Sequence, residues 1–290
     1  MIKALIKTMR LRQWTKNVFV LAALVFDRKL TIPAYFLPTI AGIFIFCFLS
    51  SSVYILNDVF DIEADRVHPK KRNRPIASGK LSITAAVVAA IIIFIITIIC
   101  AFYLSTEFGW IALAYFIMNL AYSIWLKHIP LIDVLIISAG FVLRVAGGVS
   151  LIDVERFSPW LYVCIALGAL YIGFGKRRAE LALLAGNAEN HRRVLNGYTI
   201  PFLDQLIMIV SSTTIIVYSL YTFSAPNLPT NHAMMLTIPF VIYAIFRYLY
   251  LIQVKGEGGA PEDLLLSDHP FQISILLWGI SVLLVFYLSK

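Results

Sequence analysis

The sequence predicts an all-α integral membrane protein, and two observations carry that prediction. Of the 290 residues, 60% are hydrophobic and only 14% are charged, whereas a soluble domain carries about a quarter charged residues. The apolar residues are gathered into runs of about 20, the length at which a helix crosses the hydrocarbon core of a bilayer. We therefore expect a bundle of transmembrane helices that forms a single transmembrane domain over residues 1–290.

Eight apolar runs are long enough to span a membrane. They cover residues 34–57, 82–104, 109–126, 130–151, 159–182, 201–223, 233–254 and 270–289. A shorter run at residues 17–30 precedes them, and Asp27, Arg28 and Lys29 cut it to less than a full span unless it tilts or lies partly at the interface. With this segment included, we expect nine transmembrane helices.

The basic residues are distributed unevenly among the predicted loops. In the nine-helix arrangement, 18 of the 24 lysines and arginines lie on the side of the N-terminus, four lie on the opposite side, and Arg144 and Arg247 lie within spans. Cytoplasmic loops of membrane proteins carry the excess of basic residues. We therefore expect the N-terminus and the two densest polar loops to be cytoplasmic. This asymmetry accounts for the net charge of +8 without a nucleic-acid partner.

The densest group of charges follows the second full span, in the stretch LNDVFDIEADRVHPKKRNRPIASGK at residues 56–80. At 100° per residue, one side of a helix continued through this stretch holds Asn57, Asp58, Asp61 and Asp65, whereas Glu63 points to the other side. Carboxylates that share a face repel one another and need a counter-charge. Neighbouring lysines and arginines could supply it as a structural ion-pair network. Mg²⁺ could also supply it, since it prefers oxygen ligands and completes its shell with water and phosphates. We favour the metal, because a solvated run of charges would not confine its acids to one face.

Basic residues follow the acids directly and recur in a second loop at residues 173–199, GFGKRRAELALLAGNAENHRRVLNGYT. Arginine and lysine bind the phosphate oxygens that a metal leaves unneutralised, so we predict phosphate binding at both loops. Binding of anionic lipid head groups is the alternative. Arg144, inside a span, indicates a polar cavity or an anionic ligand, because a lone guanidinium is costly there.

The stretch NDVFDIEAD, Asn57 to Asp65, has the form N-D-x-x-D-x-x-x-D and resembles the signature of the UbiA superfamily of intramembrane prenyltransferases. The resemblance covers nearly the whole chain. It implies a nine-helix bundle around a central cavity, with a polar mouth on the cytoplasmic side and a lateral opening for an isoprenoid chain.

The loop after the sixth span distinguishes between branches of that superfamily. Members that prenylate aromatic acceptors carry a second aspartate motif there, whereas this sequence reads GKRRAEL. Together with RQWTKN, DIEADRVHPKKRNRPIASG, YSIWLK and FVLRVAGG, this loop is similar to the bacterial branch named for decaprenyl-phosphate phosphoribosyltransferase. Leu11 departs from that branch, which has a proline at this position, so the geometry of the N-terminal segment is open.

The resemblance implies a reaction and assigns roles to the charged residues. It implies a bacterial inner (plasma) membrane enzyme that transfers 5-phosphoribose from phosphoribosyl diphosphate (PRPP) to a polyprenyl phosphate, with Mg²⁺ as cofactor, for cell-envelope polysaccharide precursors. Asn57, Asp61 and Asp65 are then the expected metal ligands, and Asp58, Asp61 and Asp65 the catalytic acids. The expected ligands of the phosphates and the ribose are Lys16, Arg66, Lys71, Arg72, Arg74, Tyr122, Lys127, Arg144, Lys176, Arg177 and Glu180.

Other functions and roles remain open at this point. An aromatic prenyltransferase would use a polyprenyl diphosphate donor and ignore PRPP. A transporter would also carry paired repeats and charges in the membrane, but it should have polar residues near the midplane, and here the charges crowd one side. Tyr122 and Lys127 could anchor a span at the interface, and Lys176 and Glu180 could form a surface pair. The oligomeric state is also open, a homo-oligomer included.

Overall fold

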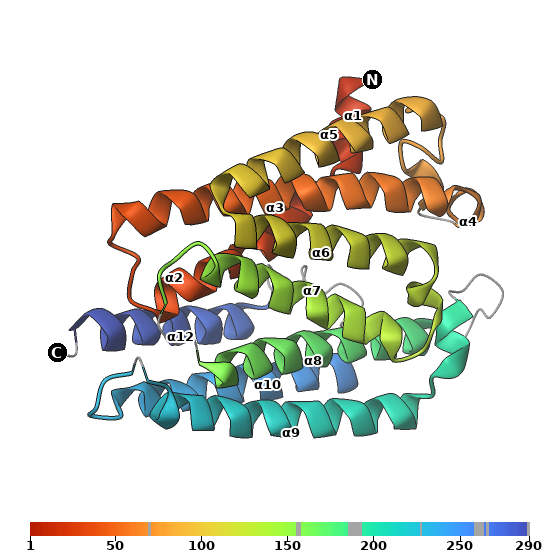
Figure 1. The fold of residues 1–290 in the computed structure, drawn as a ribbon. Coiled ribbons are helices and arrows are strands. Elements are labelled where there is room, and N and C mark those ends of the chain that lie inside the picture. The colour runs from red at the N-terminus through yellow and green to blue at the C-terminus, as the bar shows by residue number, and fades with distance from the viewer. Residues whose placement is uncertain are drawn as a thin grey trace. The chain divides into compact units, whose positions relative to one another are not determined.

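The structure is a computed structural model that describes residues 1–68, 71–154, 158–184, 193–226, 228–257, 264 and 267–288. Within these ranges every regular element is helical (Figure 1). The chain divides into two compact units. The first contains residues 1–136 and 140–155, and the second contains residues 137–139 and 156–290.

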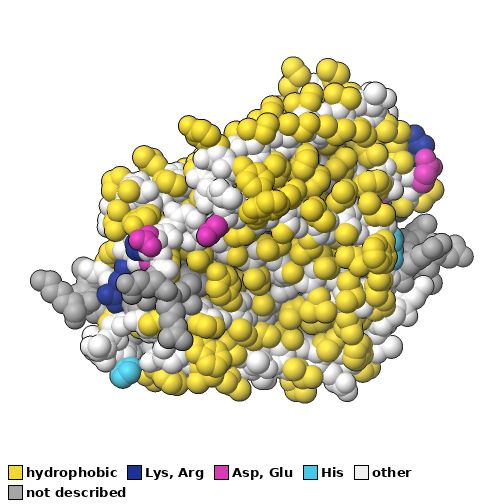
Figure 2. All heavy atoms as spheres, in the orientation of Figure 1, with side chains coloured by type: hydrophobic (Ala, Val, Ile, Leu, Met, Phe, Trp, Pro, Cys, Tyr) yellow, Lys and Arg dark blue, Asp and Glu magenta, His cyan; other side chains and the backbone are white. Residues whose placement is uncertain are grey.

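Eight helices are long and apolar enough to cross a membrane. They are α3 (Pro33–Phe60), α5 (Ile83–Leu104), α6 (Thr106–Ile124), α7 (Ile132–Val149), α8 (Pro159–Leu184), α9 (Ile200–Ser224), α10 (Ile238–Gln253) with the preceding 3₁₀ turn η5 (Ala233–Thr237), and α12 (His269–Leu288). Hydrophobic side chains cover most of the visible face (Figure 2), as expected for a surface in contact with lipid. The eight predicted full spans are therefore confirmed.

The weaker run at residues 17–30 does not form one long α-helix. A short helix α1 (Ile2–Thr8) comes first and is followed by the 3₁₀ helix η1 (Leu11–Leu21) and the five-residue helix α2 (Ala22–Phe26). Neither η1 nor α2 is among the eight helices that meet the length and hydropathy requirements of a span. The described residues thus confirm eight of the nine predicted spans.

In the first unit, α3 packs against α5, α6 and η1. The core between these elements contains Phe46, Leu49 and Val53 of α3 together with Phe108 and Tyr115 of α6, all buried. The α5 and α6 helices are joined by the single extended residue Ser105, so they must run antiparallel as neighbours (Figure 1). This packing fixes the end of α3, where the acidic residues lie.

A close backbone contact holds η1 against α7. A Cβ atom added to Gly148 of α7 would lie 2.0 Å from the backbone oxygen of Val20 and 3.0 Å from its carbonyl carbon. Only glycine permits this approach, since the obstructing atoms belong to backbone and cannot rotate away. We expect Gly148→Ala to destabilise the protein by about 1–3 kcal/mol, measured by thermal unfolding in detergent.

Gly168 in α8 provides a matched control, because a Cβ atom added there would meet no heavy atom within 4 Å. Gly168→Ala should stabilise the protein slightly, by about 0.5–1 kcal/mol, through the higher helix propensity of alanine. If both variants unfolded at the temperature of the parent protein, the contact between Gly148 and Val20 would not restrict η1.

In the second unit, α8 packs against α9 and α10, and α10 packs against α12. Arg178 of α8 ties three helices: it donates to both carboxylate oxygens of Asp204 in α9, at 2.6 and 3.4 Å, and to the backbone oxygen of Ile252 in α10 at 2.9 Å. Arg247 of α10 donates to both oxygens of Asp268, just before α12, at 3.1 and 2.8 Å. That hydrogen bond lowers the pKa of Asp268 from its ordinary value. Both arginines therefore hold helices together.

Candidate functional site

The acidic stretch lies at the end of α3, where the helix is interrupted at one residue. The α3 helix ends at Phe60, Asp61 has φ −92° and ψ 5°, and a second short helix α4 (Ile62–Val67) follows. The prediction of one continuous helix through Asp65 is therefore wrong at Asp61. The backbone hydrogen bonds from Asp61 to Asn57 (3.0 Å) and from Asp65 to Asp61 (2.8 Å) nevertheless keep these residues on successive turns.

Two of the acids form a buried cluster with two arginines. The side chains of Asp58 and Asp65 are each only 3% exposed. Arg74 Nη1 lies 2.6 Å from Asp65 Oδ2 and 3.0 Å from Asp58 Oδ1, so one guanidinium bridges both carboxylates. Arg10 Nη2 pairs with the same oxygen of Asp58. The ion-pair alternative raised by the sequence is thus present at these two acids.

Asp61 has different partners and a more open position. Lys127 Nζ donates to Asp61 Oδ1 at 2.5 Å, and Asn57 Nδ2 donates to Asp61 Oδ2 at 3.1 Å. The side chain of Asp61 is 25% exposed, whereas that of Lys127 is 7% exposed. Lys127 lies in the 3₁₀ turn η3 (Leu126–His128), directly after α6. The interaction therefore joins the break after α3 to a loop on a different part of the chain.

Arg10 is the residue of this cluster that sequence reasoning missed. It lies between α1 and η1 with φ 54° and ψ 56°, a left-handed conformation that costs a non-glycine residue about 1–2 kcal/mol. Ser51 of α3 fixes the turn by donating to the backbone oxygen of Met9 at 3.1 Å, and Trp14 donates to Ser51 at 3.0 Å. The basic stretch around Arg10 was a signal, but its pairing with Asp58, 48 residues away, has no periodic pattern in the sequence.

Arg144 of α7 is buried in a network of neutral acceptors. It donates to Asn17 Oδ1 of η1 at 2.8 Å, to the Gly140 backbone oxygen at 2.8 Å, and to the Tyr115 hydroxyl of α6 at 2.7 Å. Its guanidinium also lies over the ring of Tyr115, 4.7 Å from the centroid. Arg144 thus links η1, α6 and α7, and its predicted binding of phosphate stays a prediction.

The remaining predicted residues of the first unit lie on α4, η1, α6 and a turn that follows α4. Arg66 of α4 pairs with Glu63 at 2.9 Å, and Glu63 is 81% exposed, which confirms that this acid points away from the buried pair. Lys16 lies on η1, Tyr122 lies on α6, and Lys71 and Arg72 lie on the 3₁₀ turn η2 (Lys71–Asn73). For these residues, phosphate binding stays a prediction.

The predicted residues of the second unit lie in the C-terminal half of α8. Arg177 is 2% exposed and donates to Glu180 at 2.7 Å. Glu180 therefore forms its ion pair with Arg177. The alternative reading of a surface pair required Lys176 as the partner. Residues 185–192 of the second predicted loop lie outside the described ranges.

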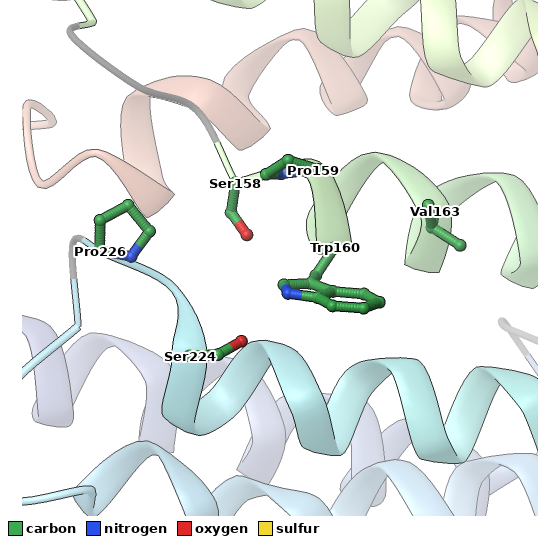
Figure 3. Close-up of a pocket in the computed structure, with 6 residues that line it drawn as sticks. All are labelled: Ser158, Pro159, Trp160, Val163, Ser224 and Pro226. Carbon is green, nitrogen blue, oxygen red and sulfur yellow. The ribbon is translucent and has the colours of Figure 1, made fainter.

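The second unit also contains a cavity of about 370 Å³, lined by Ser158, Pro159, Trp160, Val163, Ser224 and Pro226 (Figure 3). These residues lie at the start of α8 and at the end of α9, with Ser158 just before α8 and Pro226 just after α9. The predicted phosphate ligands of α8 lie toward its opposite end. The cavity is therefore separate from the predicted phosphate ligands of α8.

The acids can be tested for their fit to Mg²⁺. Among the described residues, no group of three or more His, Cys, Asp or Glu side chains is arranged to hold a metal ion. Mg²⁺ is commonly bound through one or two carboxylates, with waters and substrate phosphates completing the octahedron. Asp61 and Asn57 meet that requirement, because their side chains are in contact and partly exposed. Together they offer a carboxylate and an amide oxygen. Asp58 and Asp65 fit less well, because arginines occupy them.

Comparison with known proteins places this chain in a family. The sequence model of the UbiA prenyltransferase family matches residues 17–261. The chain belongs to the UbiA prenyltransferase family. The family resemblance read from the N-D-x-x-D-x-x-x-D stretch is therefore confirmed.

Relatives of this UbiA family chain include two bacterial enzymes. Decaprenyl-phosphate phosphoribosyltransferase of Corynebacterium glutamicum is 35% identical, over 98% of this chain and 87% of its own length. The protein of the same name from Mycolicibacterium smegmatis is 35% identical, over 96% of this chain and 91% of its own length. The resemblance to that branch is confirmed.

Among solved structures, a UbiA homolog from Archaeoglobus fulgidus bound to GPP and Mg²⁺ has a TM-score of 0.75 at 18% identity, covering 98% of this chain and 99% of its own. The same homolog bound to DMAPP and Mg²⁺ has a TM-score of 0.75, with 97% and 98% of the two chains covered. At this identity the likeness shows the UbiA fold.

Proposed function

We propose that this UbiA family protein transfers 5-phosphoribose from PRPP to a polyprenyl phosphate and releases diphosphate. The observation that carries the proposal is 35% identity over nearly the whole chain to two enzymes named decaprenyl-phosphate phosphoribosyltransferase. The residues agree, because the loop after the sixth predicted span has bases where aromatic prenyltransferases have a second aspartate motif. Three phosphate-bearing groups meet in this reaction, and they require more cations than a single diphosphate does.

In this reaction the bond from ribose C1 to the diphosphate oxygen breaks, and a phosphate oxygen of the lipid forms a new bond to C1 from the opposite face. The attacking phosphate is already ionised, so no general base is needed. The enzyme must hold the two anions in line and stabilise the charge on the departing diphosphate. These tasks call for fixed cations and an oxygen-rich metal site.

Asn57 and Asp61 are the residues best placed to hold Mg²⁺, which when bound neutralises charge on the leaving diphosphate. Asp65, the third predicted ligand, is held by Arg74 at 2.6 Å. We assign Asp58 and Asp65 the task of fixing Arg10 and Arg74 beside the proposed metal ligands Asn57 and Asp61. The two carboxylates then hold the two guanidinium groups next to the site.

The phosphate ligands proposed in the first unit are Lys127 and Arg74, followed by Lys16, Arg66, Lys71, Arg72 and Arg144, with Tyr122 as a hydroxyl donor. In the second unit, Lys176 and Arg177 are proposed to bind phosphate. Glu180 orients Arg177 through their 2.7 Å hydrogen bond. Arginine suits this work because its planar fork matches two phosphate oxygens at once.

We further propose that η1 and α2 together form the first of nine spans in a single catalytic domain with a cytoplasmic N-terminus. The 11 residues of η1 and five of α2 reach about 30 Å, because a 3₁₀ helix rises about 2 Å per residue and an α-helix about 1.5 Å. That length is close to the thickness of the hydrocarbon core, with Arg12 and Lys16 in the half of η1 nearer the cytoplasm. In intact cells, an impermeant thiol reagent should not label a Lys3→Cys variant, and it should do so once the membrane is opened. Labelling in intact cells would reverse the orientation.

The function is tested with purified protein, PRPP and decaprenyl phosphate, with Mg²⁺ or with a chelator. We expect a polyprenyl phosphoribose, identified by mass spectrometry, and stoichiometric diphosphate that disappears with the chelator. A parallel reaction contains a polyprenyl diphosphate and 4-hydroxybenzoate. Prenylation of the aromatic acid without turnover of PRPP would replace this proposal with an aromatic prenyltransferase.

A further inference from the structure

The contact between Asp61 and Lys127 occupies the carboxylate that the proposed function assigns to the metal. Lys127 Nζ lies 2.5 Å from Asp61 Oδ1. A lysine that is only 7% exposed needs a counter-charge, because an unpaired buried ammonium group is costly. A divalent cation and Lys127 therefore cannot both use this oxygen at low cost.

Asp61 and Lys127 can separate more easily than the neighbouring acid pairs. Asp58 is held from two sides, by Arg10 and Arg74, and the same Arg74 also holds Asp65, so one guanidinium ties two buried carboxylates together. Among the residues that the structure describes, Asp61 forms an ion pair with one lysine, Lys127. That lysine lies in the three-residue turn η3, and Asp61 lies at the break between α3 and α4. Moving the two groups apart requires no change inside a membrane-spanning helix.

We propose that Lys127 and a divalent cation compete for Asp61, and that a bound diphosphate resolves this competition by becoming the new partner of Lys127. The proposal rests on the proposed function, in which Asn57 and Asp61 hold the metal. Lys127 leaves Asp61 when a diphosphate oxygen offers it a stronger counter-charge, and the carboxylate becomes open to the cation.

One consequence is that metal and diphosphate bind with positive coupling. Each ligand alone must break the contact between Asp61 and Lys127, whereas together they share that cost. By linkage, the factor by which diphosphate improves metal affinity equals the factor by which metal improves diphosphate affinity. A site of this kind stays free of metal until its anionic substrate arrives.

The test measures binding of Mn²⁺ as the metal probe and of inorganic diphosphate, each alone, to the purified full chain. In Lys127→Met, Mn²⁺ should bind about tenfold more tightly than in the parent protein, within the range usual for coupled sites. Diphosphate without metal should bind about tenfold more weakly, because its cation is gone. Electron paramagnetic resonance of free Mn²⁺ and calorimetry give the two constants. Competition predicts tighter binding of Mn²⁺ and weaker binding of diphosphate. A general loss of the site would weaken the binding of both.

The matched control is Lys80→Met, which removes the same charge from an exposed lysine in the first predicted cytoplasmic loop. It should shift neither affinity by more than about twofold, since exposed charges are screened. Asp61→Asn combined with Lys127→Met should bind Mn²⁺ no more tightly than Asp61→Asn alone, because the contested carboxylate is absent. If Lys127→Met does not fold, Lys127→Gln removes the charge while keeping a hydrogen-bond donor.

Unchanged or weaker Mn²⁺ affinity in a folded Lys127→Met protein would overturn the competition. The proposed function fails by a different result, namely absence of transfer from PRPP in the parent protein. The two outcomes are distinguishable because Mn²⁺ and inorganic diphosphate report on the site without turnover.

Discussion

Replacing Asp61 by asparagine is expected to lower kcat/KM for PRPP by about 10²–10³-fold, the usual effect of removing one preorganised electrostatic contact to a developing charge. Asp61 is the acid of the stretch that combines partial exposure with an adjacent Asn57, at 3.1 Å. Asparagine keeps the size of the side chain but removes the charge that attracts both Lys127 and a metal. The measurement is steady-state release of diphosphate at several Mg²⁺ concentrations.

Glu63→Gln is the control for this experiment, because Glu63 is two residues from Asp61, is 81% exposed and pairs with the exposed Arg66. An exposed pair of this kind contributes about 0–1 kcal/mol, so turnover should stay within about twofold. Raising Mg²⁺ should recover part of the activity of Asp61→Asn if the loss is one of metal affinity. Equal activity in the two variants would remove Asp61 from the site.

The sequence predicted the long helices well, because length and hydropathy are local properties. The eight runs and the eight long apolar helices differ by only a few residues at their ends. The exception is residues 17–30, where the local pattern indicated a weak α-helix. The 3₁₀ form depends on tertiary contacts that no local window contains, namely the buried Asn17 bound by Arg144 and the backbone contact at Gly148.

For the candidate site, too, the sequence predicted the local arrangement but not the tertiary partners. Helical periodicity brought Asn57, Asp58, Asp61 and Asp65 together and excluded Glu63, as the structure does. Periodicity says nothing about partners from elsewhere in the chain, and the cations that decide how each acid is used are 48 and 66 residues away for Asp58 and Asp61. The split into a closed arginine-bound pair and an open lysine-bound acid is therefore a tertiary property.

The closed pair leads to the largest expected effect on stability. Arg74→Met should destabilise the protein by about 3 kcal/mol, toward the lower end of the range for breaking a buried ion pair, because the side chain of Arg74 is itself 25% exposed. Two carboxylates, each 3% exposed, would lose the guanidinium that bridges them. Unfolding by titration with a denaturing detergent measures the change. Arg72→Met, on the exposed neighbour two residues away, should change stability by no more than about 0.5 kcal/mol.

A second substitution separates the loss of a bridge from the loss of packing. Asp65→Asn removes one of the two charges that Arg74 neutralises, so the double variant Arg74→Met with Asp65→Asn should be more stable than Arg74→Met alone. Asparagine needs no counter-charge, whereas an unpaired buried aspartate must be neutralised or hydrated. The interaction energy of the cycle should then be about 1–3 kcal/mol, as for residues in one hydrogen-bonded network. Strict additivity would mean that Arg74 stabilises the end of α3 through its aliphatic stem, and the two carboxylates would not depend on it.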